Sequence, residues 1–60
     1  MNSNQFKRWL ARQGCIFEPA KGGHLLVRCG RHRSYIPMHG SRKQLRKGLV
    51  TKIKKDLGLM

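Results

Sequence analysis

The segment Lys21–Cys29, with the sequence KGGHLLVRC, decides the fold of this chain. Two glycines form a turn, and the apolar run that follows them alternates with a period of two, as in a half-buried β-strand. We therefore predict a strand over residues 24–29. Alternation places Leu25, Val27 and Cys29 on a face that packs under helices, and His24, Leu26 and Arg28 on an outward face.

A helix is predicted before this strand. Phe6, Trp9 and Leu10 recur at helical spacing. Ser3 fits the N-cap position, and Gly14 fits the position just past the end of the helix. We expect the two aromatic rings to pack in the core rather than to stack on nucleobases.

Two more strands are predicted, over residues 15–18 and 33–38. Pro19 and the glycine turn end the first of them. Pro37 lies near the end of the second, which suits the end or the edge of a sheet. Tyr35 is expected to face outward, because it alternates with the apolar residues around it.

The C-terminal part is predicted to be helical. Ser41-x-x-Gln44 fits a capping box, yet Gly48 interrupts the pattern. A short turn over residues 41–47 followed by a helix over residues 48–57 fits better than one long helix. Its buried stripe is expected to consist of Leu49, Val50, Ile53 and Leu57.

These elements predict an α+β fold in one small domain that covers residues 1–60. The order is helix, three strands, helix, which gives a three-stranded antiparallel sheet with both helices on one face. A chain of 60 residues buries only about 60% of its unfolded surface, so its core is thin.

The charge of the chain points to a polyanionic partner. Fourteen Lys and Arg residues stand against two acidic residues, which gives a net charge of +12. Nucleic acid is the commonest partner of so basic a chain. No stretch approaches the roughly 18 apolar residues of a membrane span, and residues 1–5 lack an apolar signal core, so we expect a cytoplasmic protein without a membrane partner.

The two cysteines do not make a zinc site. Cys15 and Cys29 form no Cys-x-x-Cys pair, and the histidines are not spaced as in zinc fingers. Both lie in apolar, strand-like contexts, where a free cysteine behaves as a small hydrophobic residue. We interpret them as reduced and buried, with a cross-strand disulfide or a redox role as the alternatives.

The residue composition excludes several classes of enzyme that act on nucleic acids. Glu18 and Asp56 are the only carboxylates, too few for a two-metal nuclease, and Gly22-Gly23 is too short for a phosphate loop. We expect no metal and no cofactor. RNA cleavage needs less, because the ribose 2′-hydroxyl is a built-in nucleophile and histidine suits both proton-transfer roles. His24 is the candidate, although a histidine at the start of a strand is more often a surface or packing residue.

The other candidate site residues surround His24 or follow the third strand. Lys21 and Arg28 are expected to assist at the phosphate, and Gly23 offers a bare backbone N–H for close approach of a phosphate. His39 is a candidate cap, phosphate contact or second acid. His32 lies between two arginines, and we interpret it as a solvated turn residue.

These motifs resemble the HicA toxins of bacterial HicA–HicB toxin–antitoxin modules. The resemblance spans essentially the whole chain, and the following residues carry it: Phe6, Leu10, Gly14-Cys15, Lys21-Gly22-Gly23-His24, Ile36-Pro37-Met38-His39, Leu45, Gly48-Leu49-Val50, Ile53 and Leu57-Gly58-Leu59. One departure is that family members usually have Ser or Thr before the histidine, where this chain has Gly23.

The resemblance implies a fold like the double-stranded-RNA-binding domain and a ribosome-independent mRNA interferase with His24 as its catalytic residue. It also implies a role in stress response and a HicB-type antitoxin that covers the active site. Binding of DNA is then expected only through the antitoxin complex. Two alternatives stay open: a small basic RNA-binding protein without catalysis, and an interaction protein for an acidic partner.

Overall fold

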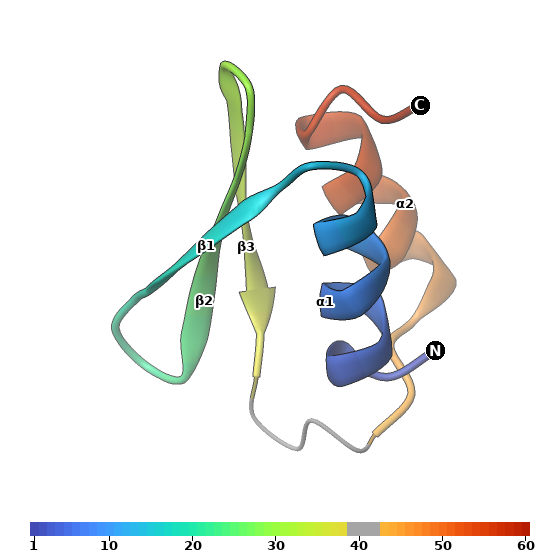
Figure 1. Cartoon of the computed structure of the whole chain (residues 1–60). Helices are drawn as coiled ribbons and strands as arrows, with labels where there is room; N and C mark the ends of the chain where they lie inside the picture. Colours follow the sequence, from blue (N-terminus) through green and yellow to red (C-terminus); the bar gives the residue numbers. More distant parts are fainter. Residues whose placement is uncertain (39–42) are drawn as a thin grey trace.

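The computed structural model describes residues 1–38 and 43–60 of the chain. Its elements are α1 (Ser3–Arg12), β1 (Ile16–Pro19), β2 (His24–Cys29), β3 (His32–Pro37) and α2 (Lys47–Asp56). The strands form one antiparallel sheet in the order β1-β2-β3, and both helices lie on the same face of it (Figure 1). This arrangement confirms the predicted α+β fold. None of the described helices is long and apolar enough to cross a membrane.

The predicted N-cap of the first helix is wrong by one residue. Asn2, not Ser3, caps α1: its side chain accepts a hydrogen bond from the Gln5 backbone N–H at 2.8 Å, and the Gln5 side chain accepts one from the Asn2 backbone N–H at 2.8 Å. This reciprocal pair is a capping box built on asparagine. Ser3 is instead the first helical residue and is buried.

Ser3 links α1 to the sheet by a hydrogen bond, and we expect its loss to destabilise the fold. Its hydroxyl donates to the carbonyl oxygen of Pro37 at 2.7 Å. Ser3→Ala leaves that carbonyl without this partner, and we expect a loss of about 1–2 kcal/mol in the free energy of unfolding. Asn4→Ala, an exposed neighbour in the same helix, is the matched control in a chemical denaturation experiment. Equal stability of the two variants would contradict this role for Ser3.

The strands agree with the sequence prediction to within one residue. β2 has the predicted bounds, whereas β1 and β3 are displaced by one residue from the predicted 15–18 and 33–38. β1 begins later because the Cys15 N–H donates to the Leu10 carbonyl at 3.2 Å and so still belongs to the end of α1. β3 begins earlier because His32 pairs with Cys29 across a two-residue turn.

α2 also begins one residue before the predicted helix, and Leu57 is its C-cap. Arg46 occupies the N-cap position without a side-chain hydrogen bond to the helix. The capping box expected from Ser41 lies outside the described residues. Gln44 instead forms an isolated β-bridge with Asn2, which joins the segment before α2 to the start of α1.

The core fills the space between the sheet and the two helices. Its buried apolar residues come from every element except β1, together with Cys15 beside that strand: Phe6, Leu10, Cys15, Val27, Cys29, Ile36, Ile53 and Leu57. Trp9 is half-buried and stacks on Phe6, with ring centroids 6.1 Å apart. The Lys54 ammonium lies over the Trp9 ring, 4.6 Å from its centroid. The predicted core role of both aromatic residues is therefore confirmed.

The expectation of reduced cysteines is wrong. Cys15 and Cys29 are both buried, as predicted, but they form a disulfide with Cα atoms 4.4 Å apart. The reason lies in the strand register: Ile16 pairs with Arg28, so the residues next to this pair, Cys15 and Cys29, face each other across the sheet. The alternative reading, a cross-strand disulfide, is the one that the structure contains.

Candidate functional site

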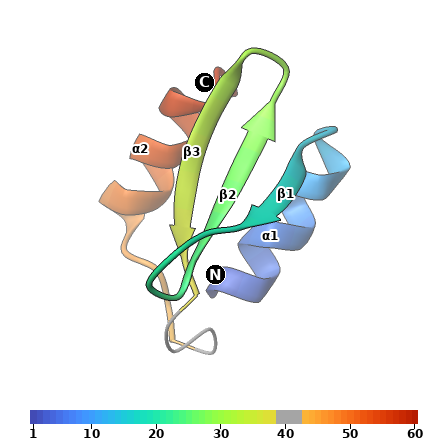
Figure 2. The ribbon, with the colours of Figure 1, turned by 90° about the vertical axis from the view of Figure 1, so that its left-hand side faces the viewer.

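The sheet has one face that the helices leave uncovered, and His24 lies on it. Figure 2 shows this face toward the viewer with both helices behind the strands. On β2, Val27 and Cys29 are buried beneath the sheet while His24 and Arg28 are exposed on the opposite face. The predicted alternation is confirmed, and it places an accessible imidazole at the first residue of the central strand.

The turn before His24 depends on glycine. Gly22 and Gly23 both have φ of +70°, in the left-handed region that glycine adopts readily and other residues rarely do. A residue with a Cβ atom there costs about 1–2 kcal/mol, so serine or threonine at position 23 would be strained in this turn. A Cβ atom on Gly22 would lie 3.6 Å from Nδ1 of His24, which places the imidazole beside the turn.

Backbone hydrogen bonds fix the position of His24 from both sides. The Ala20 N–H donates to the His24 carbonyl at 3.2 Å, and the Met38 N–H donates to the Gly23 carbonyl at 2.8 Å. His24 also pairs with Pro37 on β3, whose carbonyl is held by Ser3. The imidazole is therefore exposed to solvent on a backbone that is anchored to β1, β3 and α1.

An open pocket lies beside His24 on the uncovered face. Its volume is about 490 Å³, and its lining residues are Ala20, Lys21, His24 and Tyr35. The predicted pair of Lys21 and His24 is thus brought together, with Gly23 exposed next to them. Tyr35 is 53% exposed and faces outward, as its alternation with Ile36 predicted.

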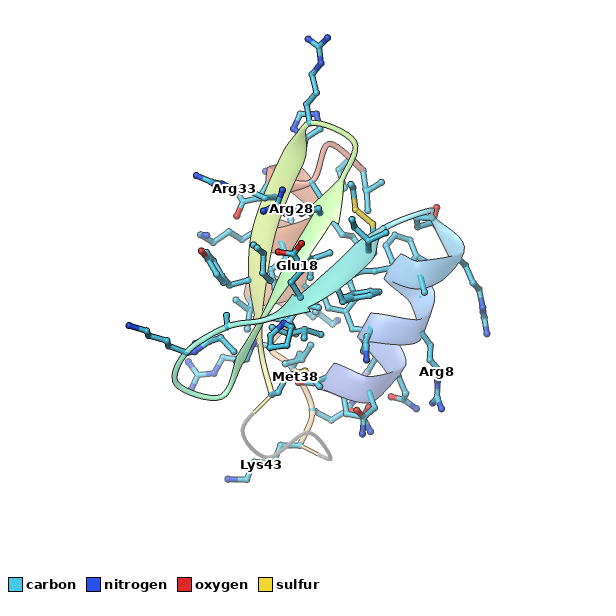
Figure 3. The ribbon with its side chains drawn as sticks, turned by 60° about the vertical axis from the view of Figure 1, so that its left-hand side comes forward. Arg8, Glu18, Arg28, Arg33, Met38 and Lys43 are labelled. Atoms are coloured by element: carbon cyan, nitrogen blue, oxygen red, sulfur yellow. A yellow bond between two sulfur atoms is a disulfide. The ribbon has the colours of Figure 1, made fainter. Side chains whose placement is uncertain are left out.

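Arg28 shares the face of His24 but lies outside this pocket. The two lie four positions apart along β2, about 13 Å at the rise of an extended strand. The Arg28 guanidinium lies 3.5 Å from the Glu18 carboxylate, and Figure 3 shows both side chains on the uncovered face with Arg33 near them. Arg33 pairs with Arg28 in the strand register. The structure therefore places two arginines at the opposite end of the face from His24.

Both side-chain carboxylates of the chain are paired with residues other than His24. Glu18 pairs with Arg28, and Asp56 accepts from the Lys52 ammonium at 3.0 Å and from the Ser34 hydroxyl at 3.3 Å. The hydrogen bond from Lys52, above all, holds the pKa of the Asp56 carboxyl below its usual value. Among residues 1–38 and 43–60, no three His, Cys, Asp or Glu side chains gather as a metal site would require.

Of the other two histidines, only His32 is among the described residues, and it does not line the pocket. His39 lies outside the described residues. His32 begins β3 and pairs with Cys29, at the end of the β2–β3 hairpin opposite to His24, where its ring lies against Gly58. The sequence alone does not identify Tyr35 and Arg33 as site residues, because their place beside His24 and Arg28 depends on the register of β2 against β3.

Comparisons with known proteins agree with this architecture. Residues 3–59 match the model of the HicA toxin family of bacterial toxin–antitoxin systems. The chain is 39% identical over 59 residues to a probable mRNA interferase HicA of Pseudomonas fluorescens (strain Pf0-1), covering 98% of this chain and 97% of that protein. A solved structure, the HicAB toxin–antitoxin complex of E. coli, contains a chain that matches with a TM-score of 0.86 and 33% identity, over 97% of this chain and 98% of that one. The chain belongs to the HicA toxin family.

Proposed function

We propose that this protein is an mRNA interferase toxin of a HicA–HicB module, which cleaves RNA without a metal ion or the ribosome and uses His24 as its general acid or base. The observation that carries the proposal is the exposed imidazole of His24 beside Lys21 in an open pocket on the uncovered face of the sheet. The name of the Pseudomonas fluorescens relative, an mRNA interferase, supports the same reaction class.

The reaction uses the nucleophile that RNA itself carries. The 2′-hydroxyl attacks the adjacent phosphorus, a base removes its proton, and a bond forms between O2′ and phosphorus. The bond between phosphorus and O5′ then breaks, and an acid gives a proton to the leaving 5′-oxygen, which leaves a 2′,3′-cyclic phosphate and a 5′-hydroxyl. Histidine suits either proton transfer. Lys21 stabilises the extra negative charge that develops on the phosphate oxygens.

The other candidate residues extend the contact with the RNA backbone. Gly23 is exposed beside His24 and has no side chain to keep a phosphate from the backbone. Arg28, about 13 Å along the strand, is too distant for the same phosphate and contacts a neighbouring one. His39 remains a candidate for the second proton-transfer group. In this proposal the RNA strand lies along β2 and β3 on the uncovered face of the sheet.

A HicB-type antitoxin is the proposed protein partner. The solved chain with which this chain shares 33% identity comes from a toxin–antitoxin complex. An antitoxin that covers the uncovered sheet face would block access of RNA to His24. We place the reaction in the cytoplasm, where mRNA is found, and assign DNA binding only to the antitoxin complex.

The test is cleavage of a labelled single-stranded RNA by the purified protein in excess EDTA. We expect products that end in a 2′,3′-cyclic phosphate, and no products from an RNA of the same sequence with 2′-O-methyl groups. Cleavage only after addition of Mg²⁺ would overturn the metal-independent mechanism. RNA that is bound but never cleaved would assign the protein to the non-catalytic RNA-binding class.

A further inference from the structure

We propose that the pocket beside His24 is a nucleobase-binding subsite, in which the ring of Tyr35 stacks on a base next to the cleaved phosphate. The position of the base next to the cleaved phosphate rests on the proposed function. The binding of a base at Tyr35 does not. It assigns a ligand class, a nucleobase, to a residue that has no part in the proton transfers.

The Tyr35 side chain is exposed to solvent on a strand whose neighbouring residues are buried. It lies in the middle of β3 and is 53% exposed, while its neighbours Ser34 and Ile36 are buried on the opposite face of the strand. Its partner across the sheet is Leu26, which is half-buried. A tyrosine held this way offers a flat aromatic surface at little cost in conformational entropy. An exposed aromatic ring on a sheet is the kind of surface on which single-stranded RNA bases stack.

The register places Tyr35 at the distance that one nucleotide spans. His24 lies two residues before Leu26 on β2, so Tyr35 and His24 are diagonal neighbours, about 7–8 Å apart across the two strands. Both line the same pocket, with Lys21 as its cation. A phosphate held by Lys21 and His24 would therefore have the base of its own nucleotide, or of the next one, over the Tyr35 ring.

Two arginines beyond Tyr35 are placed to bind a further phosphate of the same RNA strand. The next outward-facing pair along β2 and β3 is Arg28 and Arg33, about 7 Å beyond the pair of Leu26 and Tyr35. Two like charges directly opposite each other weaken a sheet unless an anion lies near them. Glu18 neutralises only one of them. An RNA strand along this face would place a further phosphate at the arginines, with Tyr35 between two phosphate-binding positions.

The experiment measures binding of a short 2′-O-methyl RNA, which cannot be cleaved, with one base at a time removed. For the wild-type protein, removal of the base at one position should weaken binding by about 5- to 100-fold. Tyr35→Ala should weaken binding of the intact RNA by the same factor and should be insensitive to base removal at that position. Tyr35→Phe keeps the ring and should bind like the wild type.

Ile16→Ala is the matched control, because Ile16 is an exposed apolar residue on a strand of the same sheet, 59% accessible, but does not line the pocket. We expect no change in its RNA affinity. With a cleavable RNA, Tyr35→Ala should raise KM and leave kcat within about twofold, since the proton transfers do not involve the ring.

Two results would overturn the subsite. One is a Tyr35→Ala variant that loses as much affinity on base removal as the wild type does. The other is a Tyr35→Phe variant as weak as Tyr35→Ala, because the hydroxyl and not the ring would then make the contact. A protein that binds RNA with this dependence on Tyr35 but never cleaves it would sink the nuclease proposal and keep the subsite.

Discussion

His24→Ala should reduce the rate of RNA cleavage by about 10²- to 10⁴-fold, the usual cost of removing one general acid–base group. The imidazole is exposed, so its loss leaves no cavity in the core and no buried group without a partner. The melting temperature should therefore stay close to that of the wild type. Initial rates on a labelled RNA in excess EDTA, together with a thermal melt, measure both quantities on the same preparation.

His32→Ala is the matched control for this variant. It removes the same side chain from the same hairpin, at the end of β2 and β3 that lies farthest from the pocket. We expect its cleavage rate to remain within a few-fold of the wild type. Full activity of His24→Ala, or an equal loss in both variants, would mean that His24 takes no part in the proton transfers.

The RNA affinity of the His24→Ala variant distinguishes an acid–base role of His24 from a role in RNA binding alone. Lys21, Arg28 and Arg33 remain in the His24→Ala variant, so its affinity for a 2′-O-methyl RNA should change by less than about tenfold. A variant that binds RNA and does not cleave it is the expected combination. A variant that neither binds nor cleaves would point to a contact role for His24 rather than an acid–base role.

The sequence predicted those parts of the fold that depend on local pattern. The bounds of β2 follow from its alternation, and the end of α1 follows from Gly14, whose φ of +88° suits a residue just past a helix. The sequence does not determine the first residue of α1, because asparagine and serine are both good N-caps and stand next to each other. Only the hydrogen bonds of Asn2 decide between them.

The sequence could not predict features that depend on strand register. The distance between Tyr35 and His24, the pairing of Arg28 with Glu18 and the contact between the two cysteines all follow from which residues face each other across the sheet. A shift of one residue would turn each of these side chains to the other face. The type of turn sets the register, and here two glycines with positive φ do so between β1 and β2.

Reduction of the Cys15–Cys29 disulfide should destabilise the protein by about 3 kcal/mol, the value expected from loop closure for a bridge over 14 residues. A chain of this size has only about 5–15 kcal/mol of stability in total. Since each kcal/mol lowers the melting temperature of a small domain by about 4–8 °C, we expect a fall of about 12–24 °C on addition of a reductant. Thermal melts with and without the reductant measure it.

The double variant Cys15→Ala/Cys29→Ala is the control, because it should melt at the same temperature in both conditions. It separates the loss of the bridge from any direct effect of the reductant on the rest of the chain. A wild-type protein whose melt ignores the reductant, with two free thiols detected before its addition, would contradict a stabilising disulfide. Because the bridge joins the end of β2 that is remote from His24, the folded double variant should still cleave RNA at a rate near that of the wild type.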